Sequence, residues 1–366
     1  MMFRLPQAVA AVYDRRRTIT AVTDRRYRLG RLLFALVFSF PLALAALDSE
    51  PAPLASRSLL LDVTRAGNRL VAVGDRGHIL LSDDEGGSWR QVIVPTRAML
   101  TGVSFGDDRH GWAVGHDGVI LATIDGGQTW SRQDPGEDLE TVFLDVYFSD
   151  PLHGLTVGAY GKGRLTIDGG KSWQPASPVP DEVHINQAAA ADDTLYLAGE
   201  SGTLLVSTEA RNSWPRLALP YDGSIFDVKS TGGKSAAAPD GRTAWRKLAV
   251  PYEGSLFGVV PLGGKSLLTY GLRGHVYVSE DAGATWELRP IPVPILIQAG
   301  LRLKSGLIVL GGLGGNFFLS RDGGHTFEGW KPAAYTGGVA GLLETADGAL
   351  LAAGELGVVR LQVPVK

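Results

Sequence analysis

Residues 111–130 read Gly-Trp-Ala-Val-Gly-His-Asp-Gly-Val-Ile-Leu-Ala-Thr-Ile-Asp-Gly-Gly-Gln-Thr-Trp, and this stretch decides the fold. It predicts two short apolar strands joined by a tight turn, followed by a polar turn that ends on an aromatic residue. Similar stretches recur along the chain, and the aromatic residues that end them stand at positions 89, 130, 173, 214, 286 and 327. Most of these positions are 41 or 43 residues apart, a spacing typical of a repeat architecture.

A short polar turn closes each repeat, and in five copies it carries an aspartate after Ser or Thr. The carboxylate and the hydroxyl can hydrogen bond to backbone groups of the turn, and the glycine supplies a positive φ. The tryptophan that follows can pack between neighbouring sheets. We therefore expect a structural role, with metal binding or catalysis as the alternative, for Asp84, Asp125, Asp168, Asp281 and Asp322 and for Trp89, Trp130, Trp173 and Trp286.

Four short strands in about 41 residues are the signature of one propeller blade. The fold class that we predict is all-β, a β-propeller with seven blades favoured and eight as the alternative. Its last repeat, Val339 to Val363, supplies only three strands, and we expect residues 47–54 to pair with it as an outer strand that closes the ring. The strands expected in the second repeat are Leu100–Phe105, Gly111–Gly115, Val119–Thr123 and Thr129–Gln133.

A tandem duplication disturbs the repeat after residue 207. Residues 214–235 and 245–266 are identical at 13 of 22 positions, and the first copy reaches its next tryptophan too early to form a full blade. We favour seven blades with the extra unit as an excursion from the ring, and an eighth, defective blade is the other interpretation.

The N-terminus has the layout of an export signal. Arg25, Arg26, Arg28 and Arg31 precede the apolar run Leu32 to Leu47, and small residues near its end offer a cleavage site. We therefore assign residues 1–47 to a signal peptide, with 1–24 as a possible extension of the gene model, and residues 48–366 to the propeller. The protein is expected to be exported to the periplasm, and retention of the run as a membrane anchor is the alternative.

Composition excludes several classes of function. Net charge is −3, but residues 1–47 hold eight Arg and two Asp, so the remainder carries −9 and makes a poor nucleic-acid binder. The chain has no cysteine, and its seven histidines show no metal-ligand spacing. We expect no nucleic-acid partner, no metal and no cofactor.

The repeat resembles that of a known family. The combination of Gly111 to Gly118 with an Asp-Gly-Gly-x-Thr-Trp turn is similar to the photosystem II stability/assembly factor family, whose turn is an Asp-box or bacterial neuraminidase repeat. The resemblance implies an exported, seven-bladed, non-catalytic propeller that assists the assembly of a membrane or envelope protein complex. In a photosynthetic source the complex would be photosystem II, and the factor would lie in the thylakoid lumen. Elsewhere it would be another complex, such as a transporter.

Asp-box propellers also include hydrolases, so a carbohydrate-active enzyme of the sialidase or glucanase type, or a glycan-binding propeller, is the alternative function. A sialidase should carry a Phe-Arg-Ile-Pro motif before its first Asp-box. The nearest string here, Arg289 to Pro292, lacks the aromatic residue and follows the fourth intact box. We therefore expect no enzyme activity and assign no catalytic residues.

Turns between the second and third strands and crossovers between blades should emerge on one rim of a propeller. Their glycines follow from the repeat, but their variable residues do not, and several are Arg, Tyr or His, which suit interface anchors. The residues that we predict to bind a partner on this rim are Arg76, His116, Tyr160, Tyr221, Tyr252 and Arg273.

Overall fold

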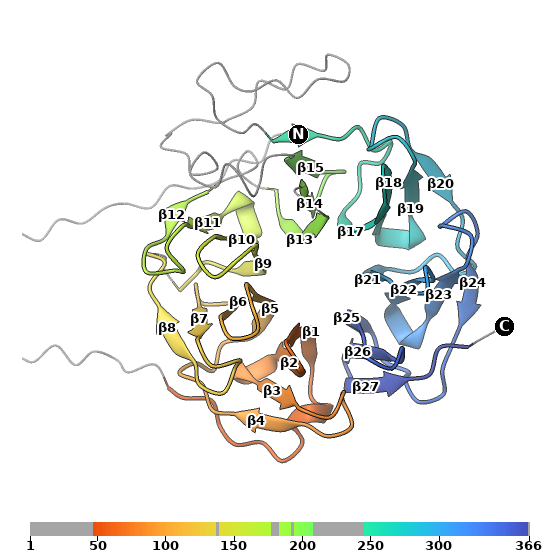
Figure 1. The fold of residues 1–366 in the computed structure, drawn as a ribbon. Coiled ribbons are helices and arrows are strands. Elements are labelled where there is room, and N and C mark those ends of the chain that lie inside the picture. Colours follow the sequence, from red (N-terminus) through yellow and green to blue (C-terminus); the bar gives the residue numbers. More distant parts are fainter. Residues whose placement is uncertain (1–46, 137–138, 177–182, 192–193, 208–244, 365–366) are drawn as a thin grey trace, which may run out of the picture. The chain divides into compact units, whose positions relative to one another are not determined.

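The computed structural model describes residues 47–136, 139–176, 183–191, 194–207 and 245–364, all within a compact unit that runs from Ala46 to Lys366 (Figure 1). Regular structure in these residues is strand, apart from five short 3₁₀ turns. None of their helices has the length and apolar character that a membrane crossing requires. The 3₁₀ turns are η1 (Ala55–Arg57), η2 (Asp75–Gly77), η3 (Ala159–Gly161), η4 (Leu272–Gly274) and η5 (Leu313–Gly315).

The strands form seven antiparallel sheets, the blades, so the predicted seven-bladed propeller is confirmed. The innermost strands contact one another in sequence, and β25 contacts β1 to close the ring (Figure 1). Blades 1 to 3 comprise β1 (Leu60–Ala66), β2 (Arg69–Gly74), β3 (Ile79–Ser82), β4 (Arg90–Val92); β5 (Leu100–Phe105), β6 (Gly111–Gly115), β7 (Ile120–Thr123), β8 (Ser131–Gln133); and β9 (Phe143–Phe148), β10 (Gly154–Gly158), β11 (Gly163–Thr166), β12 (Gln174–Pro175).

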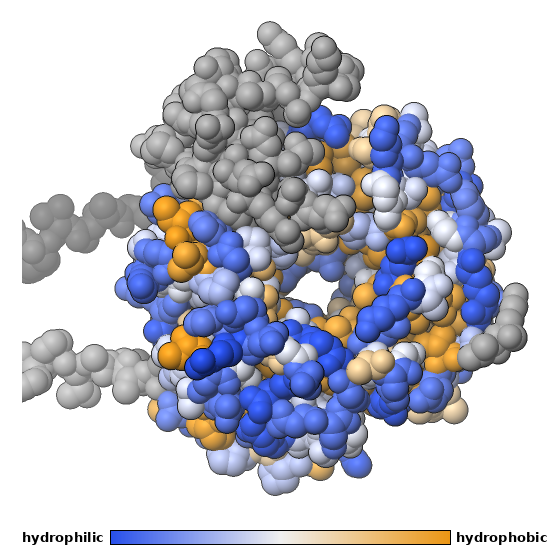
Figure 2. Space-filling view, in the orientation of Figure 1, coloured by the Kyte–Doolittle hydropathy of each residue, from blue (hydrophilic) through white to orange (hydrophobic). Residues whose placement is uncertain are grey.

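Blades 4 to 6 also have four strands, and blade 7 has three, in each case in chain order from the innermost strand outward. Figure 2 shows an opening at the centre of the ring. These blades comprise β13 (Ile185–Ala191), β14 (Thr194–Gly199), β15 (Leu204–Ser207), β16 (Arg246–Lys247); β17 (Leu256–Gly263), β18 (Ser266–Gly271), β19 (Val276–Ser279), β20 (Glu287–Arg289); β21 (Ile297–Arg302), β22 (Ile308–Gly312), β23 (Phe317–Ser320), β24 (Glu328–Trp330); and β25 (Val339–Glu344), β26 (Leu350–Gly354), β27 (Gly357–Leu361).

The core lies between neighbouring blades. The strand β6 is buried at every residue because a blade covers each of its faces, which explains why its apolar run is continuous. Trp130, which closes blade 2, packs with Val71 and Leu81 of blade 1 and donates from Nε1 to the Gly127 carbonyl at 2.9 Å. Trp89 likewise joins blade 1 to Ala353 of blade 7.

The Asp-box turn is held by its own side chains. In blade 2, Asp125 Oδ1 accepts from the Thr123 hydroxyl at 2.8 Å and from the Thr129 N–H at 2.9 Å, and its Oδ2 accepts from the Thr129 hydroxyl at 2.6 Å. In blade 5, the backbone N–H and then the hydroxyl of Thr285 hold the pKa of Asp281 at about 2. The same hydrogen bonds form around Asp84, Asp168 and Asp322.

Blade 4 takes its outer strand from the second copy of the duplicated unit. The strand β16 begins directly after Trp245 and pairs with β15, so the described strands make seven blades and blade 4 is completed by the later copy. The earlier copy, residues 214–235, lies outside the described residues. Trp214, which the repeat spacing predicts as the closing aromatic, lies outside the described residues, as does Tyr221.

The prediction that residues 47–54 add an outer strand to the last blade is wrong, because blade 7 stays three-stranded. The segment instead lies along β4 of blade 1, where the Ala52 N–H donates to Gln91 Oε1 at 2.7 Å. Pro51 and Pro53 have no N–H, which removes two of the donors that a strand ladder would use. Residues 55–58 then occupy the place of a crossover, with the Ser56 carbonyl against Gly357.

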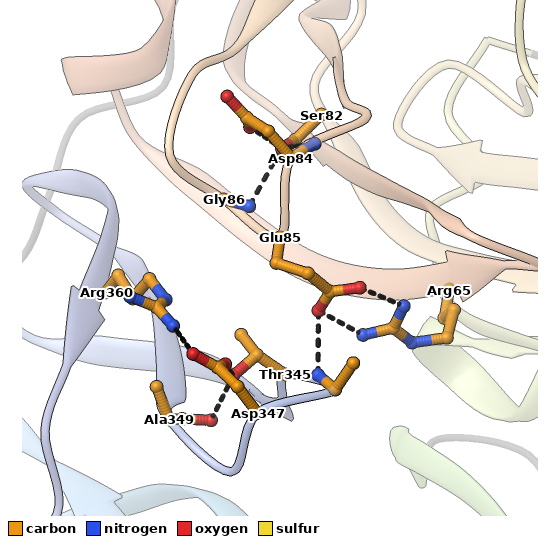
Figure 3. Close-up of polar contacts among 10 residues, drawn as sticks. Arg65, Ser82, Asp84, Glu85, Gly86, Thr345, Asp347, Ala349 and Arg360 are labelled. Atoms are coloured by element: carbon orange, nitrogen blue, oxygen red, sulfur yellow. Dashed lines mark hydrogen bonds and ion pairs between the residues drawn. The ribbon is translucent and has the colours of Figure 1, made fainter.

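Side chains join blade 7 to blade 1 on the rim that carries the Asp-box turns (Figure 3). Glu85 forms a two-pronged pair with Arg65, with both N–O distances 2.7 Å, and also accepts from the Ala346 N–H of blade 7 at 2.8 Å. Glu85 has a φ of +57°, at a position where blade 2 carries Gly126 and blade 5 carries Ala282. The strained backbone therefore places a carboxylate at the seam of the ring.

Two aspartates on innermost strands bridge neighbouring blades. Asp62 Oδ2 accepts from the Val103 N–H at 2.9 Å, and Asp145 Oδ2 accepts from the Ala188 N–H at 2.8 Å. Their residues keep some accessible surface, but burial of the carboxyl groups raises the pKa of Asp62 to about 6. Burial, and then the charge of Asp62, raises the pKa of Asp145 to about 8.

We predict that Glu85→Gly lowers the free energy of unfolding by about 1–2 kcal/mol, although glycine suits a left-handed backbone, because the seam loses a charged hydrogen-bonded group. The control is Ala282→Gly at the equivalent turn, where φ is +60° and we expect a gain of about 0.5–1 kcal/mol. Urea denaturation of both variants measures the two effects. Equal shifts of the same sign would show that Glu85 does not close the ring.

Stability should peak near pH 4. The carboxyls of Asp62 and Asp145 lose their protons near pH 4 in the unfolded chain but keep them to about pH 6 and pH 8 in the folded protein, so stability falls as pH rises from about 4 to 8, by up to about 1.4 kcal/mol per pH unit and proton. The lowered pKa of Asp281 acts oppositely, and its contribution is lost as pH falls from about 4 towards 2. Urea midpoints across this range test the profile, and Asp145→Asn should flatten its alkaline side.

Candidate functional site

One backbone hydrogen bond fixes the turn between the second and third strands in every blade. The N–H of the first turn residue donates to the carbonyl of the residue that precedes the innermost strand, as from His116 to Met99 at 3.0 Å and from Glu200 to His184 at 3.0 Å. A second bond ties the turn to the following crossover, as from Gly161 to Val183 at 2.8 Å. Turns and crossovers therefore share one rim, which we call the turn rim.

Most of these turns place a non-glycine residue in the left-handed region. The φ values are +52° at Arg76, +55° at Tyr160 and +55° at Arg273, whereas blade 6 has Gly314 at the equivalent position. A large side chain in this conformation costs about 1–2 kcal/mol relative to an unstrained backbone. Glycine would adopt this conformation without strain, as Gly314 does in blade 6. The repeated use of larger residues therefore indicates that their side chains have a role of their own.

The predicted rim residues differ in exposure. The Arg76 side chain is 81% exposed, with Asp75 at 3.5 Å, and Tyr160 is 63% exposed. Arg273 is exposed, while His116 and Tyr252 are half-buried.

Side chains of blades 3, 4 and 5 form a set of two clusters on the turn rim. Tyr160 packs edge-to-face on His184 with ring centroids 4.8 Å apart, and His184 Nδ1 lies 3.8 Å from Glu200 Oε1. Tyr252 stacks on His275 at 4.3 Å. We call this set the aromatic band, and its members are Tyr160, His184, Glu200, Tyr252, Arg273 and His275. Arg76 and His116 lie outside it, in blades 1 and 2.

The turn of blade 4 joins the two halves of the band. Its Gly202 N–H donates to the Gly254 carbonyl at 2.8 Å, which holds the crossover that carries Tyr252 against the turn that carries Glu200. The Tyr252 hydroxyl donates to the Leu272 carbonyl at 3.3 Å. Burial raises the pKa of Tyr252, and the positive charge of Arg273 partly offsets the rise. The phenol is therefore neutral and suited to stacking and hydrogen bonding.

Sequence reasoning missed His184, which stands directly before an innermost strand. Its equivalents in neighbouring blades are Val142 and Ser255, and all three carbonyls accept the turn hydrogen bond. Aligning the repeats at this position would have shown that His184 is the only aromatic residue there. The sequence pattern does not mark this position, because its role in the fold is played by its backbone carbonyl and not by its side chain.

The opposite rim, formed by Asp-box turns and the hairpins between first and second strands, holds a hollow of about 480 Å³ between blades 1 and 2. Two of its carboxylates are already engaged, since Asp83 pairs with Arg69 at 2.6 Å and Asp125 holds its own turn. The hollow thus lacks the two available carboxylates that a paired-acid glycosidase uses. Among the described residues, no group of three or more His, Asp or Glu side chains is placed to bind a metal ion.

Comparison with known proteins supports the resemblance predicted from the repeat. A family model described as Photosynthesis system II assembly factor YCF48 matches residues 81–140 and 136–238. The chain is 37% identical over 91 residues to the photosystem II stability/assembly factor HCF136, chloroplastic, of Cyanidioschyzon merolae, which covers 23% of this chain and 21% of that protein. It is 45% identical over 42 residues to the photosystem II assembly protein Ycf48 of Thermosynechococcus vestitus, or 12% of each chain.

The chain thus spans about a fifth or less of the length of the curated relatives it matches. These relatives are named as stability and assembly factors and not as enzymes. The predicted similarity to the photosystem II stability/assembly factor family is confirmed by the family model and by these matches.

Solved structures show the same fold. The structure described as YCF48 bound to D1 peptide matches with a TM-score of 0.63 at 19% identity and covers 87% of this chain and 99% of that one. YCF48 from Cyanidioschyzon merolae matches with a TM-score of 0.62 at 17% identity, over 84% of this chain and 96% of that one. At these identities the likeness establishes the propeller fold alone.

We predict that Arg76→Gly raises the free energy of unfolding by about 0.5–1 kcal/mol, because glycine relieves the left-handed backbone and only an exposed ion pair is lost. The reverse change, Gly314→Ala at the equivalent turn with φ +63°, should cost about 1 kcal/mol. Urea denaturation measures both. A loss of stability in Arg76→Gly would mean that the arginine supports the fold and is not held there at a cost.

Proposed function

Since the chain carries the repeat of the photosystem II assembly factor family on a seven-bladed propeller, we propose that it is a non-catalytic assembly factor that binds a protein of a membrane or envelope complex. The observation that supports this most directly is the aromatic band. It gathers tyrosine, histidine and arginine on three adjacent blades, the residue types that anchor protein interfaces.

The place of action that we propose is outside the cytoplasm. Residues 1–47 have the layout of an export signal, which would deliver residues 48–366 to the periplasm, or to the thylakoid lumen in a photosynthetic source. The partner would be photosystem II in that source, and another complex such as a transporter in a non-photosynthetic bacterium. The structure described as YCF48 bound to D1 peptide gives a precedent for peptide binding by a similar propeller.

The band would bind through a small number of anchors. Tyr160 offers an exposed ring held from one side by His184, and Arg273 offers a positive charge beside the half-buried ring of Tyr252. A partner segment that crosses blades 3 to 5 could place apolar side chains on the rings and an acidic group at the arginine. We extend this proposed partner surface to Arg76 and His116 at the rest of the turn rim, and the sequence adds Tyr221, which lies outside the described residues.

Capture of the partner in the source organism tests the proposal. The full chain with a C-terminal tag is crosslinked in cells, the membranes are solubilised, and the captured proteins are identified by mass spectrometry. We expect one integral membrane protein to be enriched, and Tyr160→Ala, Tyr252→Ala or Arg273→Glu to reduce its recovery about tenfold or more, as anchors do.

The matched control is Lys171→Glu, which makes the same charge change at an exposed position in the Asp-box turn of blade 3. It should leave recovery unchanged. If Lys171→Glu and Arg273→Glu lowered recovery of the partner equally, the loss would be explained by the change in net charge and not by the position of Arg273. Absence of any enriched membrane protein over a tagged control would overturn the assembly-factor proposal.

A further inference from the structure

The described chain begins on the turn rim and is firmly attached there. The Ser49 N–H donates to the Val94 carbonyl at 2.8 Å, the Val94 N–H returns a bond to Ser49 Oγ at 3.0 Å, and Ser49 is only 3% exposed. Arg97, on the crossover between blades 1 and 2, donates from Nε to the Asp48 carbonyl at 2.8 Å and pairs with Glu50 at 2.8 Å. These contacts fix where the N-terminal part of the chain meets the propeller.

Exposed leucines gather on the same rim at blades 6, 7 and 1. Leu54 is 66% exposed, and Leu313 and Leu356 are each 42% exposed. They belong to one surface because the crossover glycines lie between them: an added Cβ would be 2.9 Å from the Leu356 side chain at Gly337 and 3.4 Å from the Leu313 side chain at Gly338. We call Leu54, Leu313 and Leu356 the leucine sector.

Contacts continue from blade 7 to the N-terminal segment. The Ser56 carbonyl lies against Gly357, so the turn that carries Leu356 abuts the segment that carries Leu54. The nearby carboxylate of Glu355 is engaged, because Glu355 Oε2 accepts from the Gly338 N–H at 2.7 Å. Removing an apolar surface from water costs less free energy when the neighbouring carboxylate already accepts a hydrogen bond from the protein than when that carboxylate has no partner.

The chain outside the described residues indicates what covers this surface. The apolar run Leu32 to Leu47 ends two residues before Ser49, and two extended residues span at most about 7 Å. Such a run is expected to enter a membrane, and it stays there where it is retained as an anchor and not cleaved. In the anchored protein the rim at Ser49 would therefore lie within about a nanometre of the lipid surface.

We propose that the leucine sector rests on the lipid surface, so that the turn rim faces the membrane and the Asp-box rim faces away. This inference rests on the export that the proposed function assumes and on retention of the run as a membrane anchor, the alternative to its cleavage. It also deepens that function, because the aromatic band on the same rim would then meet segments of the partner that lie at the bilayer surface.

The experiment uses the full chain, which has no cysteine, so single cysteines can be labelled without background. An environment-sensitive fluorophore is attached in Leu313→Cys and Leu356→Cys, with Ile124→Cys and Ile167→Cys as controls. The control residues are 66% and 40% exposed in Asp-box turns on the opposite rim. The proteins are reconstituted with phosphatidylcholine–phosphatidylglycerol vesicles whose acyl chains carry a quencher.

We expect quenching at positions 313 and 356 to exceed that at 124 and 167 by about twofold or more, because only the first pair would reach the acyl boundary. Equal quenching at all four positions, stronger quenching at the controls, or none at any position would overturn the proposal. So would shielding of positions 313 and 356 without vesicles, either in a dimer or by the apolar run folded onto the sector.

A second variant separates this proposal from the proposed function. Tyr160→Ala together with Tyr252→Ala should abolish partner capture and leave the quenching pattern unchanged. Conversely, Leu313→Glu with Leu356→Glu should weaken vesicle co-flotation several-fold, and Ile124→Glu with Ile167→Glu should not. Partner capture that survives without any lipid contact would support the function and refute the orientation.

Discussion

A single backbone hydrogen bond, repeated in all seven blades, gives the turn rim its form. It runs from the first residue of the turn to the carbonyl just before the innermost strand, for example from Asp75 to Leu59 at 3.0 Å and from Glu355 to Gly338 at 3.1 Å. Because main-chain atoms make this bond, the side chains of the turn are free to vary. The blades can therefore share one fold and still present arginine, tyrosine, serine or leucine on the rim.

Ring closure is the second constraint, and here it depends on side chains. In the part of the chain that the structure describes, blade 7 stays three-stranded, and no strand from the N-terminal segment completes it. The ring is closed by three sets of contacts. They are the contact between β25 and β1, the carboxylate of Glu85 at the seam, and the crossover formed by residues 55–58. The N-terminal segment, spared from the sheet, remains on the rim, which is why the start of the propeller and its exposed leucines are neighbours.

The sequence predicted what repetition makes visible. The 41-residue spacing led to the blades, and the Ser or Thr, Asp and Gly of each polar turn led to its hydrogen bonds, because these interactions are local. It did not predict the path of residues 47–54, which bond to Gln91 of blade 1 and add no strand to blade 7. Nor did it single out His184, or Asp62 and Asp145, whose hydrogen-bond partners are 41 and 43 residues away along the chain. The particular hydrogen bonds between blades could not be predicted, because they join residues that no local pattern connects.

The duplicated unit offers two similar segments for the outer strand of blade 4, and β15 pairs with the later one. In blade 4 the Leu248 N–H donates to the Leu204 carbonyl at 2.8 Å, and the alternation of an antiparallel ladder gives the same inward direction to the N–H of Arg246. The first copy has Pro215 in place of Arg246 and so lacks that donor. Blade 3 tolerates Pro175 one position later, where the N–H points outward. Pro215 thus removes from the earlier copy a hydrogen-bond donor that the outer strand of blade 4 uses, and the edge of β15 pairs with the later copy.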